Sequence, residues 1–144
     1  MNYEKPRLRR RDVANGFLEF FVPGTDMASV VDQRALKLKQ FVDTHTDTFH
    51  LSLGAVCKNL DLGVSERQAR RVFKASIQMG FREYTKKRRL ALAAGQLQST
   101  NISVKAIAIE AGYHSTRHFA RSFKELFRLR PLEFRKVWKQ RDVA

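Results

Sequence analysis

The sequence predicts an all-α fold of about seven helices, in which two helix-turn-helix subdomains are joined by a long linker helix. Three observations predict this fold. Apolar residues recur at the spacing of helices that bury one face. Ser29 and Ser65 stand where helices need N-caps. One pattern of helix, turn and helix occurs twice, 50 to 51 residues apart, and such self-similarity is typical of a duplicated structural unit.

The duplication is visible in two pairs of segments. Residues 52–60 align with residues 103–111, and residues 65–84 align with residues 115–134. The second pair is identical at Ser65/Ser115, Arg67/Arg117, Arg71/Arg121, Phe73/Phe123, Lys74/Lys124 and Glu83/Glu133. Because capping, basic and aromatic residues recur together, both copies are expected to build the same unit.

The chain before the duplication divides into an arm and a first helix. Residues 1–28 are expected to form an N-terminal arm, with a basic run followed by an apolar patch at residues 17–22. After the arm the apolar spacing becomes helical. Ser29 and Asp32 predict a capping box at the start of the first helix, which is expected to end near Thr46.

The first helix-turn-helix subdomain is expected to cover about residues 29–80. Its second helix spans residues 52–60, and a turn leads into a third helix that starts with Ser65 as N-cap and Gln68 as its capping partner. This third helix is amphipathic. Its inward positions are Ala69, Val72, Phe73 and Ile77, and its outward positions are Arg67, Arg70, Arg71 and Lys74.

A longer helix over about residues 81–98 is expected to link the two subdomains. Its buried face is predicted at Leu90, Ala93, Ala94 and Leu97. A basic run, residues 86–89, lies near its start, and a solvated face explains that run as well as a DNA contact does. Gly95 lies inside the helix, where glycine is about 1 kcal/mol less favourable than alanine, so either a close helix contact or simple tolerance accounts for it.

The second subdomain is expected to cover about residues 102–140. One helix is predicted at residues 103–111 and the next from Ser115 to about Phe127. The latter directs Phe119, Phe123 and Phe127 inward and exposes Thr116, Arg117, His118 and Arg121. Pro131 suits the first turn of a last helix, because the N–H that proline lacks would have no helical partner there.

The charge balance favours a polyanionic partner. The chain carries 28 Lys and Arg against 14 Asp and Glu, which gives a net charge of +14 and a pI near 10.6. In helix-turn-helix proteins the N-terminal residues of the second helix meet base edges, and arginine can contact O6 and N7 of guanine together. We therefore expect Arg67, Arg70 and Arg117 to read bases. Residues further along each helix are as well placed for phosphate as for bases; they are Arg71, Lys74, Arg121 and Lys124.

The alternative is that these cations form ordinary solvated faces. Two basic stripes at equivalent positions of two repeats favour the DNA interpretation over that alternative.

Other function classes find little support in the sequence. Cys57 is the only cysteine, so an intramolecular disulfide is impossible and a small buried hydrophobe is expected. No apolar stretch approaches the roughly 18 residues of a membrane-spanning helix, and we expect a cytoplasmic protein without membrane contact. His114 and His118 lie four residues apart without further residues at ligand spacing, and no catalytic or phosphate-loop motif is present. The sequence therefore predicts no metal, no cofactor and no enzymatic activity.

Residues 52–139 resemble the DNA-binding domain of the AraC/XylS family of bacterial transcription regulators. The second repeat carries the more specific motif, which comprises Ile107-Ala108, Gly112-Tyr113, Phe119, Phe123-Lys124, Pro131 and Glu133-Phe134-Arg135. The first repeat and linker match at Phe73-Lys74, Tyr84, Arg89, Leu90 and Ala93. With residues 29–51 as the family's first helix, residues 29–144 would form an AraC-type DNA-binding domain.

The resemblance implies that both recognition helices enter successive major grooves on one face of the duplex. The family's base-contacting positions correspond to Arg67, Arg70 and Arg71 in the first unit and to Thr116, Arg117, His118 and Arg121 in the second. Phosphate contacts are expected from Lys74, Lys124, Ser65 and Ser115. One monomer would then read an asymmetric site with sub-sites about 10 bp apart.

The expected function is a transcription regulator, with activation through contact with RNA polymerase as the expected mode and the nucleoid as its place in the cell. Only about 28 residues precede the first helix, so no small-molecule effector is expected for this chain. One alternative is a DNA-binding fragment or protein-interaction module that works with a separate sensor domain or partner through residues 17–22. A third class is non-specific nucleoid or RNA binding, although the aromatics fall on buried faces rather than on a stacking surface.

Some positions depart from the family pattern. Gln78 and Arg128 follow the two recognition helices where the family usually has glycine, so either the caps differ or each carries about 1 kcal/mol of strain. Arg130 replaces the usual hydroxyl residue before the proline and removes a helix cap, and Ala69 is smaller than the customary leucine.

Overall fold

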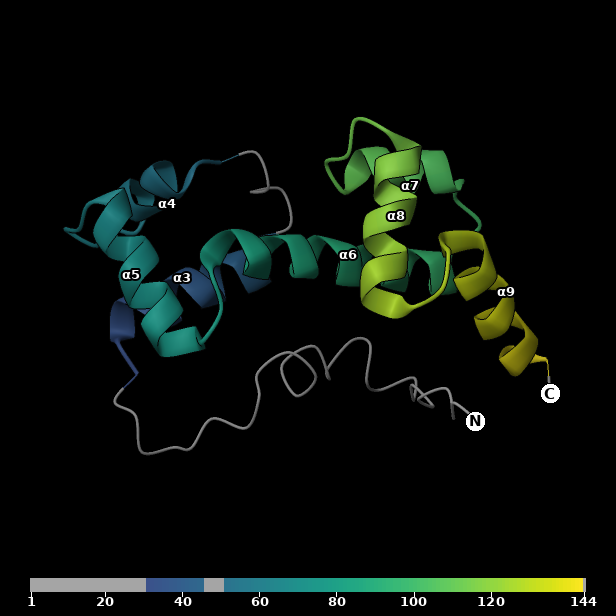
Figure 1. The fold of residues 1–144 in the computed structure, drawn as a ribbon, viewed down its shortest axis with the longest axis horizontal. Helices are drawn as coiled ribbons and strands as arrows, with labels where there is room; N and C mark the ends of the chain where they lie inside the picture. Colours follow the sequence, from purple (N-terminus) through teal and green to yellow (C-terminus); the bar gives the residue numbers. More distant parts are fainter. Residues whose placement is uncertain (1–30, 46–50, 144) are drawn as a thin grey trace.

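The computed structural model describes residues 31–45 and 51–143. Within these ranges the chain forms seven helices and no strand, which confirms the all-α prediction (Figure 1). They are α3 (Gln33–Thr44), α4 (Leu53–Asn59), α5 (Glu66–Ile77), α6 (Phe81–Ser99), α7 (Val104–Glu110), α8 (Thr116–Phe127) and α9 (Pro131–Asp142). The expected arm at residues 1–28 and the predicted cap at Ser29 lie outside the described residues.

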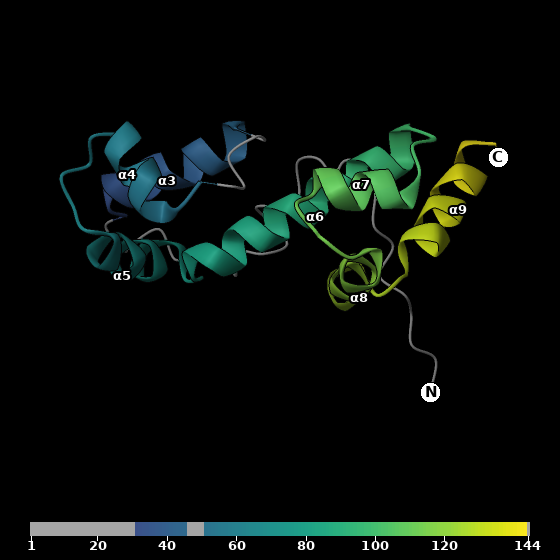
Figure 2. The same ribbon diagram turned by 90° about the horizontal axis from the view of Figure 1, so that it is seen from above.

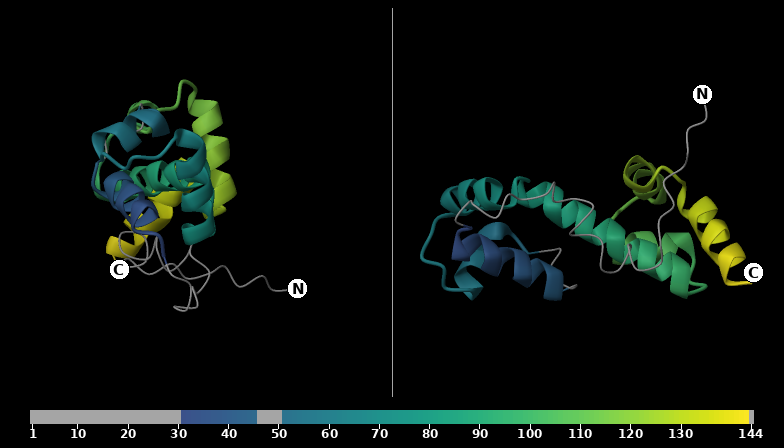
Figure 3. Two further views of the ribbon diagram at one scale, coloured as in Figure 1. Left: turned by 90° about the vertical axis from the view of Figure 1, so that its left-hand side faces the viewer. Right: turned by 90° about the horizontal axis from the view of Figure 1, so that it is seen from below.

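The helices gather in two groups at the ends of α6. Helices α3, α4 and α5 surround its first half, and α7, α8 and α9 surround its second half (Figure 1). Seen from above, α5 and α8 lie along the same side of the molecule, with α6 running between them (Figure 2). The end-on view agrees, since α5 and α8 share one edge of the outline (Figure 3).

The first group is built around Phe73 of α5. Phe73 is fully buried, and its ring makes edge contacts with Phe81 and Tyr84 at the start of α6, with centroid separations of 5.2 and 5.6 Å. Leu38 of α3 and Cys57 of α4 belong to the same core. Cys57 is therefore the buried hydrophobe that the sequence predicts, and burial raises the pKa of its thiol.

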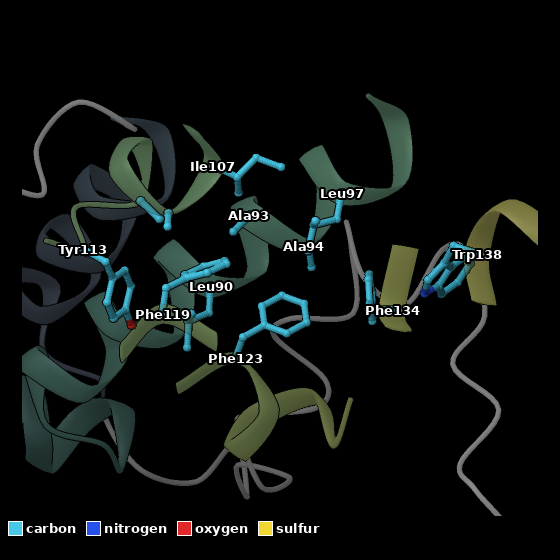
Figure 4. Packing of buried hydrophobic residues seen from close by; sticks show 12 residues of the cluster. Leu90, Ala93, Ala94, Leu97, Ile107, Tyr113, Phe119, Phe123, Phe134 and Trp138 are labelled. Atoms are coloured by element: carbon cyan, nitrogen blue, oxygen red, sulfur yellow. The ribbon is translucent and has the colours of Figure 1, made fainter. Parts of the chain in front are cut away.

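The second group repeats this plan around Phe123 of α8. Its ring contacts Phe119 at 5.7 Å and Phe134 of α9 at 5.3 Å, and the close-up shows these rings facing the linker helix (Figure 4). The linker residues in this core are Leu90, Ala93, Ala94 and Leu97. These are the four residues predicted for the buried face of the linker. Tyr84 and Ala91 of the same helix belong to the first core, so one helix contributes to both cores.

Serine N-caps start four of the helices, among them the one predicted at Ser65. The side chains of Ser52, Ser65, Ser103 and Ser115 each accept a hydrogen bond from the backbone N–H three residues later. At Ser65 the predicted capping box with Gln68 is complete, because the Gln68 carbonyl oxygen also accepts from Ser65 N at 3.1 Å. Both candidate recognition helices therefore begin where the sequence places them.

The start of the first helix differs from the prediction. Asp32 is the N-cap rather than the third helical residue, since its backbone is extended and its Oδ1 accepts from Arg34 N at 2.9 Å. The Arg34 side chain hydrogen-bonds the same carboxylate and is the main reason why the pKa of Asp32 falls to about 2. At the other end, His45 leaves the helical conformation, so α3 stops two residues short of the predicted Thr46.

The two residues that replace the family's glycines adopt the left-handed conformation that glycine would adopt. Gln78 has φ 61° and Arg128 has φ 63°, and each backbone N–H still caps its helix. Arg130 provides no side-chain cap, as expected, but the Glu133 carboxylate accepts from Arg130 N at 3.0 Å. Half of a capping box therefore remains at the start of α9.

Candidate nucleic-acid interface

The expected site residues form two matched stripes on α5 and α8. All eleven are exposed: Ser65, Arg67, Arg70, Arg71, Lys74, Ser115, Thr116, Arg117, His118, Arg121 and Lys124. Because α5 and α8 lie on the same side of the molecule (Figure 3), the structure brings the two stripes to one surface. We call the surface formed by these eleven residues the basic face.

The two stripes share three cations at equal positions. Arg67, Arg71 and Lys74 follow one another at i, i+4 and i+7 along α5, a spacing that places them on one side of the helix. Arg117, Arg121 and Lys124 repeat the pattern on α8. The N-terminal arginine of each stripe lies in the first turn, where the partial positive charge of the helix dipole adds to its own.

The capping serines have a local role besides the one expected of them. Ser65 Oγ accepts from Gln68 N at 3.2 Å, and Ser115 Oγ accepts from His118 N at 3.3 Å. A hydroxyl that accepts in a cap keeps its own hydrogen for a second partner. The Ser65 hydroxyl directs that hydrogen toward Oε1 of Gln68 at 3.4 Å, whereas the Ser115 hydroxyl can donate it to a phosphate oxygen.

Arg70 differs from the other arginines of the basic face because it is already paired. One of its terminal nitrogens lies 2.5 Å from Oε1 of Glu66, one helical turn earlier. The second stripe has no such pair, since Thr116 and Ala120 occupy the two equivalent positions. Sequence reasoning treated Arg70 as one of four outward cations and did not single out Glu66, although their i, i+4 spacing is the signal for an ion pair.

A hollow lies beside α8 on the basic face. It is lined by Ser115, Arg117, His118, Ala120, Arg121, Lys124 and Arg130. Arg130 is a cation that sequence reasoning did not place in the site, because it belongs to the turn before α9 and reaches α8 only through the packing of the two helices. His118 is held by an edge contact between its ring and Tyr113, with centroids 5.3 Å apart.

The basic run at the start of α6 is used within the protein. Lys86 lies 3.9 Å from Glu125 and Lys87 lies 3.2 Å from Glu83. Arg88 hydrogen-bonds the Asp43 carbonyl oxygen at 3.2 Å, and the Arg89 guanidinium lies 5.7 Å from the centre of the Tyr113 ring. These four side chains are half-buried, so the run joins the linker to both groups and adds little to the basic face.

The described residues contain no group of three or more His, Cys, Asp or Glu that could hold a metal ion. Among the same residues, no helix is both long enough and apolar enough to cross a membrane. The basic face offers cationic and hydrogen-bonding side chains at the starts of two helices of the same design. Such side chains can bind phosphates and base edges.

Comparison with known proteins identifies relatives of this chain by sequence and by fold. Residues 61–137 match a family described as a helix-turn-helix domain. The chain is 33% identical over 98 residues to the regulatory protein SoxS of Salmonella typhimurium, a match that covers 68% of this chain and 89% of SoxS. It is 37% identical over 83 residues to the HTH-type transcriptional activator RhaR of Mannheimia succiniciproducens.

The RhaR match covers 58% of this chain but only 29% of RhaR, so the chain spans less than a third of that relative. Among solved structures, a probable AraC family transcriptional regulator from Rhodopseudomonas palustris superimposes with a TM-score of 0.66 at 20% identity. That match covers 74% of this chain and 98% of the other, and it shows that the arrangement of the helices is shared.

Proposed function

Because this chain belongs to the AraC/XylS-type family of helix-turn-helix transcription regulators, we propose that it binds double-stranded DNA sequence-specifically and regulates transcription by placing α5 and α8 in successive major grooves. The observation that carries the proposal is the pair of matched cationic helices on one side of the molecule, with α6 between them (Figure 2). The major groove of a duplex returns to the same face once per turn. Two similar recognition helices on one side of the protein, joined by one linker helix, match this repeat.

The length of the linker helix fits this use. Nineteen residues make α6 about 28 Å long at about 1.5 Å per residue. Successive major grooves on one face of DNA lie about 34 Å apart. This length is comparable to the groove spacing and supports the binding of both grooves by one monomer. The two units are similar but not identical, so the proposed site is asymmetric.

The roles of the site residues follow from their places on the helices. We assign base reading to Arg67, Arg70 and Arg71 in α5, and to Thr116, Arg117, His118 and Arg121 in α8. Phosphate contacts are assigned to Lys74, Lys124, Ser65 and Ser115. Arg130 joins the phosphate group, because it lines the same hollow as Arg117 and Lys124.

The wider role is also a proposal. A named activator among the relatives supports activation as the mode of action, and we propose contact with RNA polymerase as its route. We propose that the protein acts as a monomer on the nucleoid in the cytoplasm, without a small-molecule effector and without an enzymatic reaction.

The test is a selection of binding sites from random duplex DNA, followed by titration of the enriched sequence and of a scrambled control at about 150 mM salt. The proposal expects an asymmetric motif with two sub-sites about 10 bp apart, bound at least about a thousandfold more tightly than the control. Equal affinity for both sequences would show that the charge binds DNA without reading it, and would overturn the proposal.

A further inference from the structure

We infer that Glu66 is a specificity-determining positioning residue: by holding Arg70, it sets the base that the N-terminal part of α5 reads. The inference rests on the proposed function. Glu66 is an acidic residue beside the cations of the basic face, and it contacts one of them directly. Its Oε1 lies 2.5 Å from a terminal nitrogen of Arg70. The two side chains are 45% and 52% exposed, so the pair lies at the surface that DNA would cover.

Two further features hold the Glu66 carboxylate in place. Glu66 is the first residue of α5, where the partial positive charge of the helix start favours an acid. Its other oxygen, Oε2, lies beside Gly54 in the first turn of α4, so close that a Cβ atom at Gly54 would be 3.2 Å away. The carboxylate therefore lies beside the first turn of α4 while the Glu66 side chain stays 45% exposed.

The position of Glu66 controls the direction in which Arg70 extends. A carboxylate one turn earlier draws the guanidinium toward the N-terminal end of α5, which is the end that meets base edges in a helix-turn-helix protein. The same negative charge repels the phosphates on either side of the groove. Arg70 has five N–H donors and its contact with Glu66 uses one, so its planar fork keeps donors for O6 and N7 of a guanine.

An exposed ion pair of this kind contributes little to stability in water. It gains strength when a partner covers it, because excluded water no longer screens the two charges. Glu66 is thus expected to matter little for the free protein and much for its choice of DNA sequence.

The second repeat provides an internal comparison. It carries Lys105, Thr116 and Ala120 at the positions of Gly54, Glu66 and Arg70. The second repeat therefore lacks all three parts of the arrangement, which are the glycine, the acid and the arginine. The first unit therefore carries an arrangement that the second lacks, and the two sub-sites of the operator are expected to differ at the base that Arg70 reads.

The experiment measures base preference at every operator position for the wild-type protein, for Glu66→Gln, for Arg70→Ala and for the double variant. Glu125→Gln is the matched control, since it removes one exposed acid from α8. We expect Glu66→Gln and Arg70→Ala to lose the preference at the same single position of the α5 sub-site, by about 5- to 150-fold, which is the range for one bidentate arginine–guanine contact. The double variant should lose no more than Arg70→Ala alone.

Glu66→Gln should also bind scrambled DNA more tightly, with a salt slope steeper by about 0.9, because a released Arg70 can take a phosphate. Preferences in the α8 sub-site should stay at wild-type values and show that the variant is folded. If Glu66→Gln keeps every base preference and behaves as Glu125→Gln does, Glu66 is an ordinary surface charge and the inference is wrong. Losses at two different positions would show that Glu66 acts independently of Arg70, and would overturn the inference equally.

Failure of the proposed function looks different. In that case the wild-type protein itself would show no base preference at any position, and the variants would differ only in overall affinity. A selective wild-type protein with an unchanged Glu66→Gln variant would leave the proposed function standing and remove only the inference.

Discussion

Tyr84 of α6 donates its phenolic hydrogen to Oδ1 of Asp43 at the end of α3, over 2.5 Å. Lys39 approaches the other oxygen of the same carboxylate at 2.9 Å, and Arg88 hydrogen-bonds the Asp43 carbonyl. Tyr84 is 1% exposed and also packs on Phe73. One buried side chain of the linker helix therefore contacts both α3, through Asp43, and α5, through Phe73.

Replacing Tyr84 by phenylalanine removes this hydrogen bond and keeps the ring. Hydrogen bonds to charged groups contribute about 1.5–3 kcal/mol, so Tyr84→Phe should lower the free energy of unfolding by that amount in urea denaturation. The control is Tyr113→Phe, since the Tyr113 hydroxyl is buried without a hydrogen-bond partner among the described residues. A loss of less than about 0.5 kcal/mol in Tyr84→Phe would show that the Asp43 contact does not hold the linker.

The same residue predicts a pH dependence. Burial, followed by the hydrogen bond to Asp43, raises the pKa of Tyr84 above its ordinary value. An unfolded tyrosine titrates near pH 10, so the stabilising contribution of the neutral phenol is fully present below about pH 10 and is lost as the pH rises further. Wild-type stability should fall more steeply than that of Tyr84→Phe between about pH 9.5 and 11. Parallel curves in thermal unfolding would contradict this prediction.

Most of the helical architecture could be predicted from the sequence because its signals are local. Ser65 and Gln68 mark a helix start by their spacing alone, and Leu90 to Leu97 mark a buried helix face by their period. The start of α3 was misjudged because Ser29 and Asp32 both suit an N-cap. The choice was decided by Asp32, whose carboxylate accepts from Arg34 N while Arg34 pairs with it in turn.

The composition of the site was harder to predict, because it depends on packing. The cations on α5 and α8 could be found from helical spacing. The place of Arg130 beside Lys124 could not, since it requires α9 to pack against α8. The place of Glu66 beside Gly54 likewise depends on how α4 packs against α5. Where a contact joins helices that are distant in sequence, the sequence identifies the residues but does not show which of them lie next to each other.

The structure distinguishes between the two explanations for Gly95 in α6, a close helix contact and simple tolerance. A Cβ atom added at Gly95 would meet no atom within 4 Å apart from the helix itself, so no close helix contact requires glycine. Gly95→Ala should therefore raise the free energy of unfolding by about 0.4–1 kcal/mol, since alanine loses less conformational freedom on folding. Chemical denaturation checks this value. Gly112→Ala is the contrasting variant, because Gly112 has φ 81° and a Cβ there would lie 3.2 Å from Arg89; it should destabilise the protein.

The helix ends at Gln78 and Arg128 predict a second stabilising substitution. A left-handed residue other than glycine carries about 1–2 kcal/mol of strain, partly offset because glycine has more freedom in the unfolded chain. Arg128→Gly should stabilise by about 0.5–1 kcal/mol in thermal or urea unfolding. Gln78→Gly should gain less, because the Gln78 amide donates to the Ala75 carbonyl oxygen at 2.9 Å and that bond would be lost. A destabilised Arg128→Gly would show that its side chain contributes more than its backbone conformation costs.

The last prediction separates base reading from phosphate binding on the basic face. Arg67 and Arg117 lie in the first turns of their helices, and Lys74 lies two turns further along α5. Arg67→Ala and Arg117→Ala should each weaken binding to the selected operator by about 1–3 kcal/mol and relax preference at one base position, in different sub-sites. Lys74→Ala should weaken binding to operator and scrambled DNA alike and lower the salt slope by about one unit.

Titrations of both duplexes across a range of salt concentrations measure these effects together. Thr44→Ala is a suitable surface control, since Thr44 is exposed at the end of α3 and bonds only within its own helix end. Equal losses on operator and scrambled DNA for the two arginine variants would show that both arginines bind phosphate, because only a base contact can distinguish the sequences. A loss for Arg117→Ala alone would show that α8 reads its groove while α5 serves mainly to position the protein.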